Sequence, residues 1–440
     1  MSRPTRLGLI GSSGFAAYHL AAIQRLEAEG LVKLVAIADP TDAANIRPRL
    51  ETDGILWYDH YGEMIERAPG LDMVSIVAPI GCHDEMTRAC TGRGLFVYLE
   101  KPPVPTIQQL EDLIVLDRLR RVCVGFQMIA SRGIQRIKKA VVDEELGRIK
   151  SIRAWGCWPR PESYYKRARW AGQMSLDGKP VFDGPATNGL AHLVHNIMYL
   201  AGPCHHDFDV PLEVEGELFR ARRIESYDIA CLRGRFQSGI DFLAALTHAT
   251  ERYSPFRLKV TGSNGWMQVS EDGDGTRLET SSGETVACGD SVRELILLSY
   301  RATIDYARGA RPRGLTHLAD TRGYVMATNG MLLSSGGIRQ IDECWVRHFR
   351  NQSGDGIDVA GLCDAIDHAG NHGSLFSEMR LPWATDPPHL IPLDAALRGR
   401  IGENFKASNF TFPRREAVVV PTSPSPANGH IPAAKSVVHD

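Results

Sequence analysis

Short apolar runs and an amphipathic pattern follow one another at the start of the chain. Residues 6–10 (R-L-G-L-I) form an apolar run that ends at Gly11, and residues 14–29 carry apolar side chains at helical spacing. A second apolar run covers residues 31–38 and ends at Asp39. Apolar runs of this length are typical of buried strands. A strand, a glycine turn, a helix and a second strand form one βαβ unit, which predicts a parallel sheet.

Three more apolar runs predict further strands of the same sheet. They cover residues 71–78, 95–99 and 122–126, and a helix is predicted from His83 to about residue 91. Each run ends in a polar or turn residue. Because ligands of open α/β sheets bind at the carboxyl ends of the strands, we expect the functional crevice there.

The pattern changes in the second half of the chain. Alternation of apolar and polar residues from about 212 to 269 predicts antiparallel strands, and residues 291–308 and 315–335 predict two helices. Residues 342–412 contain further apolar groups that predict a packed annex. Such an annex could cover the cleft or extend an oligomer interface, and the pattern does not distinguish the two.

Composition narrows the class of protein. The chain has 440 residues, with 50 basic against 52 acidic side chains and a formal net charge of −2. This balance argues against nucleic acid or a membrane surface as the main partner. The nine cysteines are scattered without a C-x-x-C pair, so neither a metal site nor a disulfide framework is expected. Reduced thiols fit a cytoplasmic enzyme better.

The turn after the first strand is a degraded form of the G-x-G-x-x-G/A dinucleotide fingerprint. A serine replaces its second glycine, and it is small enough to let backbone N–H groups approach a pyrophosphate. Asp39 could accept hydrogen bonds from the ribose hydroxyls and would repel a 2′-phosphate, which favours NAD over NADP. The alternative is a structural turn without a ligand. The candidate contacts in the turn are Gly11, Ser12, Ser13, Gly14 and Phe15.

Four features in chain order match one known family. They are the turn and helix start at residues 11–19, then Asp39, then Pro79-x-x-x-His83, and finally Glu100-Lys101-Pro102. With these residues the chain resembles the Gfo/Idh/MocA family of nicotinamide-dependent oxidoreductases. The resemblance adds cofactor contacts from Pro79, His83, Glu100, Lys101 and Gln127.

The resemblance covers residues 5–340 and implies a domain organisation. A Rossmann NAD-binding domain is expected over residues 1–127. A substrate-binding α/β domain with an open, mostly antiparallel sheet is expected over 128–341, and the sheet face implies a homodimer or homotetramer. Residues 342–420 are then the annex, and residues 421–440, rich in Pro, Ser and Ala, a disordered tail.

The family's second signature, D-x-x-x-H on a helix, is altered here. His192 falls on the family's catalytic histidine, Asn188 replaces the usual aspartate, and His195 replaces a second one. Positions 188, 192 and 195 have helical spacing and are predicted to share one face. An amide cannot act as a base, so Asn188 can only position substrate or His192. This leaves Lys101 and His192 as the catalytic pair, with His192 exchanging the hydroxyl proton and Lys101 polarising the oxygen.

A segment rich in aromatic and basic residues covers residues 155–170 (W-G-C-W-P-R-P-E-S-Y-Y-K-R-A-R-W). Aromatic faces stack on sugars, and arginine or lysine binds hydroxyls or carboxylates, so this segment suits a carbohydrate pocket, an acidic sugar included. The alternative is an ordinary aromatic cluster under a long loop. The predicted substrate contacts are Trp158, Arg160, Tyr165, Asn188 and His195.

The leading hypothesis is therefore an NAD-dependent oxidoreductase for a secondary alcohol of a sugar, sugar acid or cyclitol. A first alternative is an NAD-dependent glycoside hydrolase, which oxidises a ring hydroxyl transiently and eliminates the glycosidic group. A second alternative is a non-catalytic ligand sensor. Fold alone does not separate the three.

Overall fold

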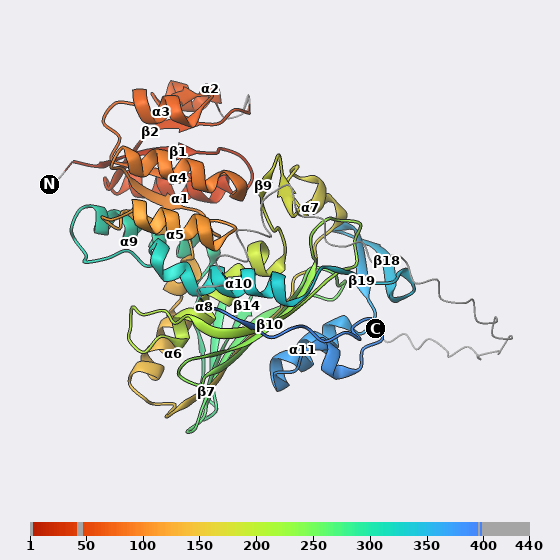
Figure 1. Cartoon of the computed structure of the whole chain (residues 1–440). Helices are drawn as coiled ribbons and strands as arrows, with labels where there is room; N and C mark the ends of the chain where they lie inside the picture. The colour runs from red at the N-terminus through yellow and green to blue at the C-terminus, as the bar shows by residue number, and fades with distance from the viewer. Residues whose placement is uncertain (1–2, 42–46, 395–396, 398–440) are drawn as a thin grey trace, which may run out of the picture. The chain divides into compact units, whose positions relative to one another are not determined.

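The apolar runs at the start of the chain all form strands of one parallel sheet. The computed structural model describes residues 3–41, 47–394 and 397, and Figure 1 shows the N-terminal part in red and orange. The sheet order is β3-β2-β1-β4-β5-β6, and each neighbouring pair is parallel. The predicted α/β class is confirmed. The strands are β1 (Thr5–Ile10), β2 (Val32–Ala38), β3 (Leu56–Tyr58), β4 (Met73–Ile76), β5 (Phe96–Leu99) and β6 (Val122–Val124).

Of the helices between these strands, α1 and α4 agree with the two predicted over residues 14–29 and from His83 to about 91, and one later helix joins them. Helix α9 (Val292–Ala307) packs on α1, and its Ile296, Tyr300 and Ile304 belong to the apolar core of the first sheet. The core of the first sheet therefore includes a helix from the predicted second domain. The first six α-helices of the described chain are α1 (Ala16–Ala28), α2 (Arg47–Thr52), α3 (Tyr61–Arg67), α4 (His83–Gly92), α5 (Ile107–Leu116) and α6 (Arg132–Val142).

A second, mostly antiparallel sheet follows in the chain. Its order is β16-β15-β14-β13-β7-β12-β11-β10-β17, with β20 paired to β10. Two pairs, β7 with β12 and β10 with β17, are parallel. The strands are β7 (Ile149–Cys157), β10 (Pro211–Arg220), β11 (Ile229–Phe236), β12 (Asp241–Thr247), β13 (Ser254–Gly262), β14 (Trp266–Asp272), β15 (Gly275–Thr280), β16 (Thr285–Ala287), β17 (Arg339–Gln340) and β20 (Ile391–Pro392).

The two faces of this sheet are covered by different parts of the chain. Helices α8 (Ala191–Ala201) and α10 (Arg322–Ser334) pack on one face, where Gly216 of β10 lies against Met331. Phe219 lies three residues after Gly216 on β10, so its side chain points to the opposite face of the sheet. There it contacts the ring of Phe376 in the C-terminal segment. The annex therefore covers the outer face of this sheet.

The annex consists of the hairpin β18 (Val346–Asn351) and β19 (Gly354–Val359), helix α11 (Leu362–His372) and the segment that follows (Figure 1). Trp155 of β7 is buried beneath α11, and its indole N–H donates to Asp367 at 3.1 Å. The predicted tail, residues 421–440, lies outside the described residues, as do residues 398–420. Among the described helices, none combines the length and the apolar character needed to cross a membrane.

The contact between α11 and Trp155 predicts a stability effect. A Cβ at Gly370 would lie 2.1 Å from Trp155 Cδ2, so Gly370→Ala forces the helix away from the sheet. We expect it to lower the free energy of unfolding by about 1–3 kcal/mol, the usual cost of overpacking a core. Gly92→Ala is the matched control, because Gly92 is an exposed helical glycine whose Cβ would meet nothing within 4 Å. Urea denaturation of both variants measures the difference; equal stabilities would contradict the described packing.

Candidate active site

The glycine turn between β1 and α1 lies against the end of the neighbouring strand. Gly11 has φ of +90°, and a Cβ there would lie 2.2 Å from the carbonyl oxygen of Val77. Any other residue would clash with this carbonyl and strain the backbone. The first glycine of the fingerprint is therefore required by a close approach of two chain segments.

Asp39, at the end of β2, holds the turn from the other side. Its carboxylate accepts hydrogen bonds from the amide and hydroxyl of Ser12, at 2.8 and 2.7 Å, and from the amide of Thr41 at 2.9 Å. The serine that follows Gly11 thus locks the turn to the acid predicted to select the ribose. The side chain of Asp39 is buried at this point, which places a negative charge beside the turn.

The start of α1 suits a dinucleotide pyrophosphate. The helix has no side-chain N-cap and no acidic residue in its first turn, and a Cβ at Gly14 would meet nothing within 4 Å. Ser13, Gly14 and Phe15 are exposed there. Free amide groups and the helix dipole favour an anion at such a terminus. These residues fit NAD, which Gly11 to Phe15 would hold at its phosphates.

The other predicted cofactor residues divide into exposed and buried groups. Pro79 is exposed at the end of β4, and Gln127 is buried with an amide oxygen that has no hydrogen-bond partner. An orphaned amide oxygen after β6 fits a polar ligand at the carboxyl ends of the strands. Their contacts with NAD stay predictions.

His83 and Glu100 hold the motif around Lys101. The two ring nitrogens of His83 lie 2.9 Å from the carbonyl oxygens of Pro102 and Ala78, and burial lowers the pKa of this imidazole. Glu100 accepts from the amide of Lys101 at 3.1 Å and lies 3.3 Å from His19 Nε2. Both side chains therefore position the lysine, whereas contact with NAD stays a prediction.

Lys101 reaches across to the second domain. Its Nζ donates to the backbone oxygen of Asn188 at 2.8 Å and to the side-chain oxygen at 3.3 Å. Burial lowers the pKa of Lys101, and the cations Arg160 and Arg167 act in the same direction, while Glu100 and Asp183 oppose them. An ammonium has three N–H donors, so one is left for a substrate oxygen.

Asn188 is connected to a carboxylate that the sequence did not reveal. Its amide donates to Asp183 Oδ1 at 2.8 Å, and Asp183 Oδ2 accepts from the amide of Gly172 at 2.7 Å. Burial raises the pKa of Asp183. The position that has lost the family's aspartate is therefore bonded to an acid five residues earlier in the chain. No local motif marks Asp183, since only the fold brings it to Asn188.

The predicted continuous helix through positions 188, 192 and 195 is wrong in one respect. Residues Pro185–Gly189 form a single π-helical turn, Leu190 breaks it, and α8 begins at Ala191. The break lets the backbone oxygen of Asn188 point to Lys101 instead of continuing the ladder of an α-helix. A widened turn of this kind is frequent at functional sites.

His192 and His195 have different surroundings. His192 is half-buried, its Nδ1 has no hydrogen-bond partner, and burial together with Lys101 holds its pKa well below the usual range. His195 is fully buried and stacked on Phe126, with ring centroids 3.9 Å apart, and burial lowers its pKa to about 3. His195 thus lies in the wall behind His192, a placement that does not support the predicted contact with substrate.

The aromatic segment is more regular than the predicted loop. Its first residues complete β7, and Glu162–Lys166 form the short helix α7. Trp158 donates to Glu271 at 3.1 Å, and the guanidinium of Arg160 lies 5.5 Å from its ring. Tyr165 packs against Arg222, whose guanidinium lies 4.9 Å from the centre of its ring. Arg160 lies beside the Lys101 site, since its Nη2 would be 3.7 Å from a Cβ at Gly189.

Two further residues complete the site and carry no sequence signal. The hydroxyl of Tyr164 lies 3.4 Å from the Asn188 amide nitrogen. His248, at the end of β12, faces Gly189, where a Cβ would lie 2.7 Å from its Nε2. Burial lowers the pKa of His248 to about 3, so its ring is neutral. The sequence predicts Tyr165, the neighbour of Tyr164, as the substrate contact. The orientation of α7 instead brings the hydroxyl of Tyr164 to Asn188.

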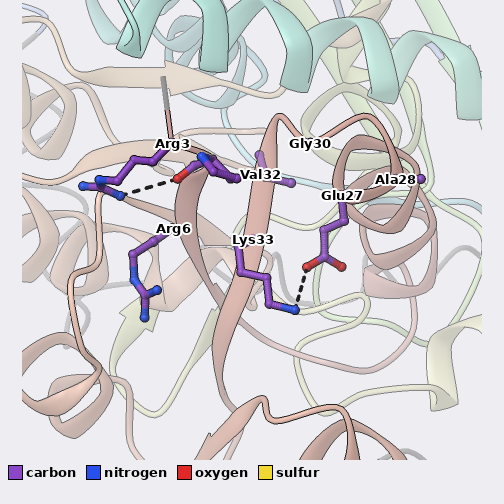
Figure 2. Close-up of a pocket in the computed structure, with 8 residues that line it drawn as sticks. Arg3, Arg6, Glu27, Ala28, Gly30, Val32 and Lys33 are labelled. Atoms are coloured by element: carbon purple, nitrogen blue, oxygen red, sulfur yellow. Dashed lines mark hydrogen bonds and ion pairs between the residues drawn. The ribbon is translucent and has the colours of Figure 1, made fainter. Parts of the chain in front are cut away.

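A surface depression at the opposite edge of the first sheet is unrelated to this chemistry. It is lined by residues at the amino ends of β1 and β2 and by the end of α1 (Figure 2). Its Lys33 lies 3.7 Å from Glu27, and Arg3 pairs with Asp72 at 2.6 Å. Ligands of α/β sheets bind at the carboxyl ends instead, where Gly11, Asp39 and Lys101 lie.

These features define a class: a two-domain α/β protein with a dinucleotide-binding turn in the first sheet and a lysine that reaches the second domain. Residues 5–127 match the model of the oxidoreductase family with an NAD-binding Rossmann fold. The resemblance to the Gfo/Idh/MocA family is thereby confirmed over the N-terminal domain, and with it NAD as the cofactor class.

The comparisons with individual proteins agree. The chain is similar to dTDP-3,4-didehydro-2,6-dideoxy-alpha-D-glucose 3-reductase of Saccharopolyspora spinosa, with 25% identity over 181 residues, or 40% of this chain. That match spans about half (53%) of the relative's length. Among solved structures, the WlbA dehydrogenase of Bordetella pertussis, in complex with NADH and UDP-GlcNAcA, is 22% identical with a TM-score of 0.64, covering 76% of this chain and 97% of that one.

The myo-inositol 2-dehydrogenase of Lactobacillus plantarum is 19% identical with a TM-score of 0.60, again covering 76% and 97%. At these identities the solved structures establish the fold of both domains. The remaining quarter of this chain has no counterpart in either of them.

The position of Asp39 predicts the choice between the two nicotinamide cofactors. A buried carboxylate beside the turn repels a 2′-phosphate, so we expect NADH to bind about tenfold tighter than NADPH, or more. Titration of the purified protein by quenching of its tryptophan fluorescence measures both affinities. Asp39→Asn, which keeps the shape of the side chain, should narrow the difference. Equal affinities in the natural protein would overturn the assignment.

Proposed function

We propose that this protein is an NAD-dependent dehydrogenase or reductase for a secondary alcohol of a sugar or cyclitol. The observation that carries the proposal is the contact between Lys101 and Asn188, one turn before His192, at the same edge of the first sheet as the glycine turn. The Lys101 ammonium, the neutral His192 ring and the glycine turn that would bind NAD therefore belong to one site. The sugar-related substrates in the names of the similar proteins support this class of substrate.

The chain's own residues handle the hydroxyl proton. NAD, when bound, supplies the acceptor for the hydride of the alcohol carbon. The free N–H of Lys101 would donate to the substrate oxygen and favour its alkoxide character. His192 is held neutral by burial and by Lys101, so it is ready to accept the hydroxyl proton during oxidation and to return it during reduction.

Asn188 and Asp183 position the lysine. Asn188 receives two donors of Lys101 through its backbone and side-chain oxygens, and its amide is in turn fixed by Asp183. This arrangement fixes the direction of the remaining N–H of the ammonium. We propose that Asp183 takes over the orienting role of the missing aspartate at position 188.

The test is NADH absorbance after mixing protein, NAD and a panel of sugars, sugar acids and inositols. Net formation of NADH with one substrate, absent in a Lys101→Ala and His192→Ala double variant, supports a dehydrogenase. Protein that binds NAD but forms no NADH with any free sugar argues for the glycoside hydrolase hypothesis, because transient oxidation regenerates NAD. Glycosides then replace the free sugars, and release of the aglycone without NADH identifies that activity.

A further inference from the structure

Two arginines near Lys101 have no carboxylate partner among the described residues. The guanidinium of Arg160 lies 4.8 Å from the ring of Tyr164, and that of Arg167 lies 3.5 Å from the same ring. Arg167 donates to the backbone oxygen of Tyr164 at 2.6 Å. Neither forms an ion pair in the described ranges, and the Nε of Arg160 is buried without a hydrogen-bond partner. Arg167 is exposed, whereas Arg160 is half-buried. A guanidinium cannot lose its proton, so burial of the Arg160 Nε without an anion is unfavourable.

Arg160 lies beside the residues that hold Lys101. A Cβ built at Gly189 would lie 3.7 Å from Arg160 Nη2, and Gly189 follows Asn188, the acceptor of Lys101. The backbone of Arg160 is fixed to the end of β12, since its amide donates to the oxygen of His248 at 3.2 Å. The ammonium and the guanidinium therefore flank the same short piece of chain.

The neighbouring Arg222 is a buried arginine whose charge is balanced by carboxylates of the chain itself. Arg222 is 2% exposed and pairs with Glu162 at 2.8 Å and with Asp228 at 3.1 Å. It also donates to the backbone oxygen of Arg160 at 2.6 Å. Within the described part of the chain, the guanidinium of Arg160 has no such carboxylate partner. The difference indicates that the partner of Arg160 comes from outside the chain.

The charge around the site is positive. Three cations, Lys101, Arg160 and Arg167, stand against two carboxylates, Glu100 and Asp183. Asp183 is already bonded to Asn188 and Gly172, and Glu100 to the amide of Lys101. We infer that the sugar carries an anionic group, a carboxylate or a phosphate, and that Arg160 binds it while Lys101 binds the reacting hydroxyl. This inference rests on the proposed function and specifies its substrate class. A planar guanidinium suits both anions because it can donate two parallel hydrogen bonds.

The cofactor is an unsuitable source of this anion. Its pyrophosphate fits the start of α1, after β1 of the first sheet, whereas Arg160 follows β7 of the second sheet. Loss of Arg160 should therefore change the affinity for the substrate and leave that for NADH unchanged.

The experiment compares matched sugars with natural and variant protein. Uronic acids, the corresponding neutral sugars and the corresponding sugar phosphates are assayed by NADH formation, and NADH affinity is measured separately. We expect the anionic sugars to be preferred, and Arg160→Gln to lower their kcat/KM by about 10- to 100-fold, as for other lost bonds to a charged group. The kcat/KM for neutral sugars should fall much less than that for anionic sugars. With anionic sugars, Arg160→Lys should lie between the natural protein and Arg160→Gln.

The control is Arg169→Gln in the same segment, where Arg169 is exposed and pairs with Asp177 at 2.9 Å. It should leave all values unchanged. Equal use of neutral and anionic sugars, or an Arg160→Gln variant that affects both alike, would overturn the inference and leave the dehydrogenase proposal intact. Weaker NADH binding in Arg160→Gln would also overturn it, because the anion would then belong to the cofactor.

A second measurement separates failure of the inference from failure of the proposed function. If no sugar forms NADH, the melting temperature of the NADH-bound protein is measured with glucuronate, glucose 6-phosphate and glucose. A rise with either anion that disappears in Arg160→Gln supports the anion site without the proposed reaction. The better of the two anions distinguishes a carboxylate from a phosphate. No rise with either anion overturns the inference.

Discussion

Replacing Lys101 by alanine is expected to lower kcat/KM for the preferred sugar on the order of 10³-fold, a typical cost of losing a charged donor at the reacting oxygen. The side chain contributes the free N–H that Asn188 leaves available, and no other described cation lies on the Asn188 oxygens. Binding of NADH should weaken far less than catalysis, because the glycine turn predicted to hold the cofactor's phosphates does not involve this side chain. Steady-state kinetics and a fluorescence titration on the same preparation measure the two effects.

Lys101→Arg is the informative control. Arginine keeps the charge, but its planar group cannot place one N–H on substrate and two on Asn188 in the same directions. We expect activity between that of the natural protein and Lys101→Ala. If Lys101→Ala left the biological activity of the protein unchanged, the ligand sensor hypothesis would gain support, since a sensor needs no polarising cation.

Replacing His192 by alanine is expected to lower the rate of oxidation by about 10²- to 10⁴-fold, the range for a lost general base. His192→Asn keeps a polar group of similar size and should be as inactive, because an amide does not accept the proton. The same substitutions should leave the affinity for NADH unchanged. An active His192→Asn variant would mean that another group takes the proton.

The pH profile of kcat/KM tests the same assignment. The pKa of His192 is held well below 6.5 by burial and by Lys101, so the base stays neutral and competent as the pH falls through 6.5. The acid limb of the oxidation rate should therefore lie below pH 6.5. The pKa of Lys101 is lowered from 10.5, so activity should decline at an alkaline pH below that value as the ammonium loses its proton. His192→Ala should lose the acid limb of whatever rate remains.

Local requirements of the backbone made the first half of the site predictable. Gly11 is needed because a carbonyl lies where its side chain would be. Asp39 directly follows the next strand and binds Ser12, so both residues can be recognised from a short sequence motif. The strand ends also placed Lys101 in the crevice. These features depend on neighbours within one βαβ unit or at one edge of one sheet.

The second half depended on contacts between distant segments. Asp183 bonds to Asn188 only because a π-helical turn directs the Asn188 side chain toward it. The sequence motif shows only that Asn188 replaces the usual aspartate. The burial of His195 follows from its stacking on Phe126, which comes from the other domain. Helical spacing predicted a shared face for His192 and His195, but it could not show how deeply each ring is covered.

The packing of α11 on β7 also determines when the second sheet can be fully covered during synthesis of the chain. Trp155 and its partner Asp367 are 212 positions apart, so the apolar outer face of the strand stays uncovered until the last part of the described chain has been made. Contacts over such separations slow folding and leave apolar surface open to aggregation. A ribosome-bound chain that ends before α11 would therefore hold a finished nucleotide domain beside an incomplete sheet, the state in which it most needs a chaperone.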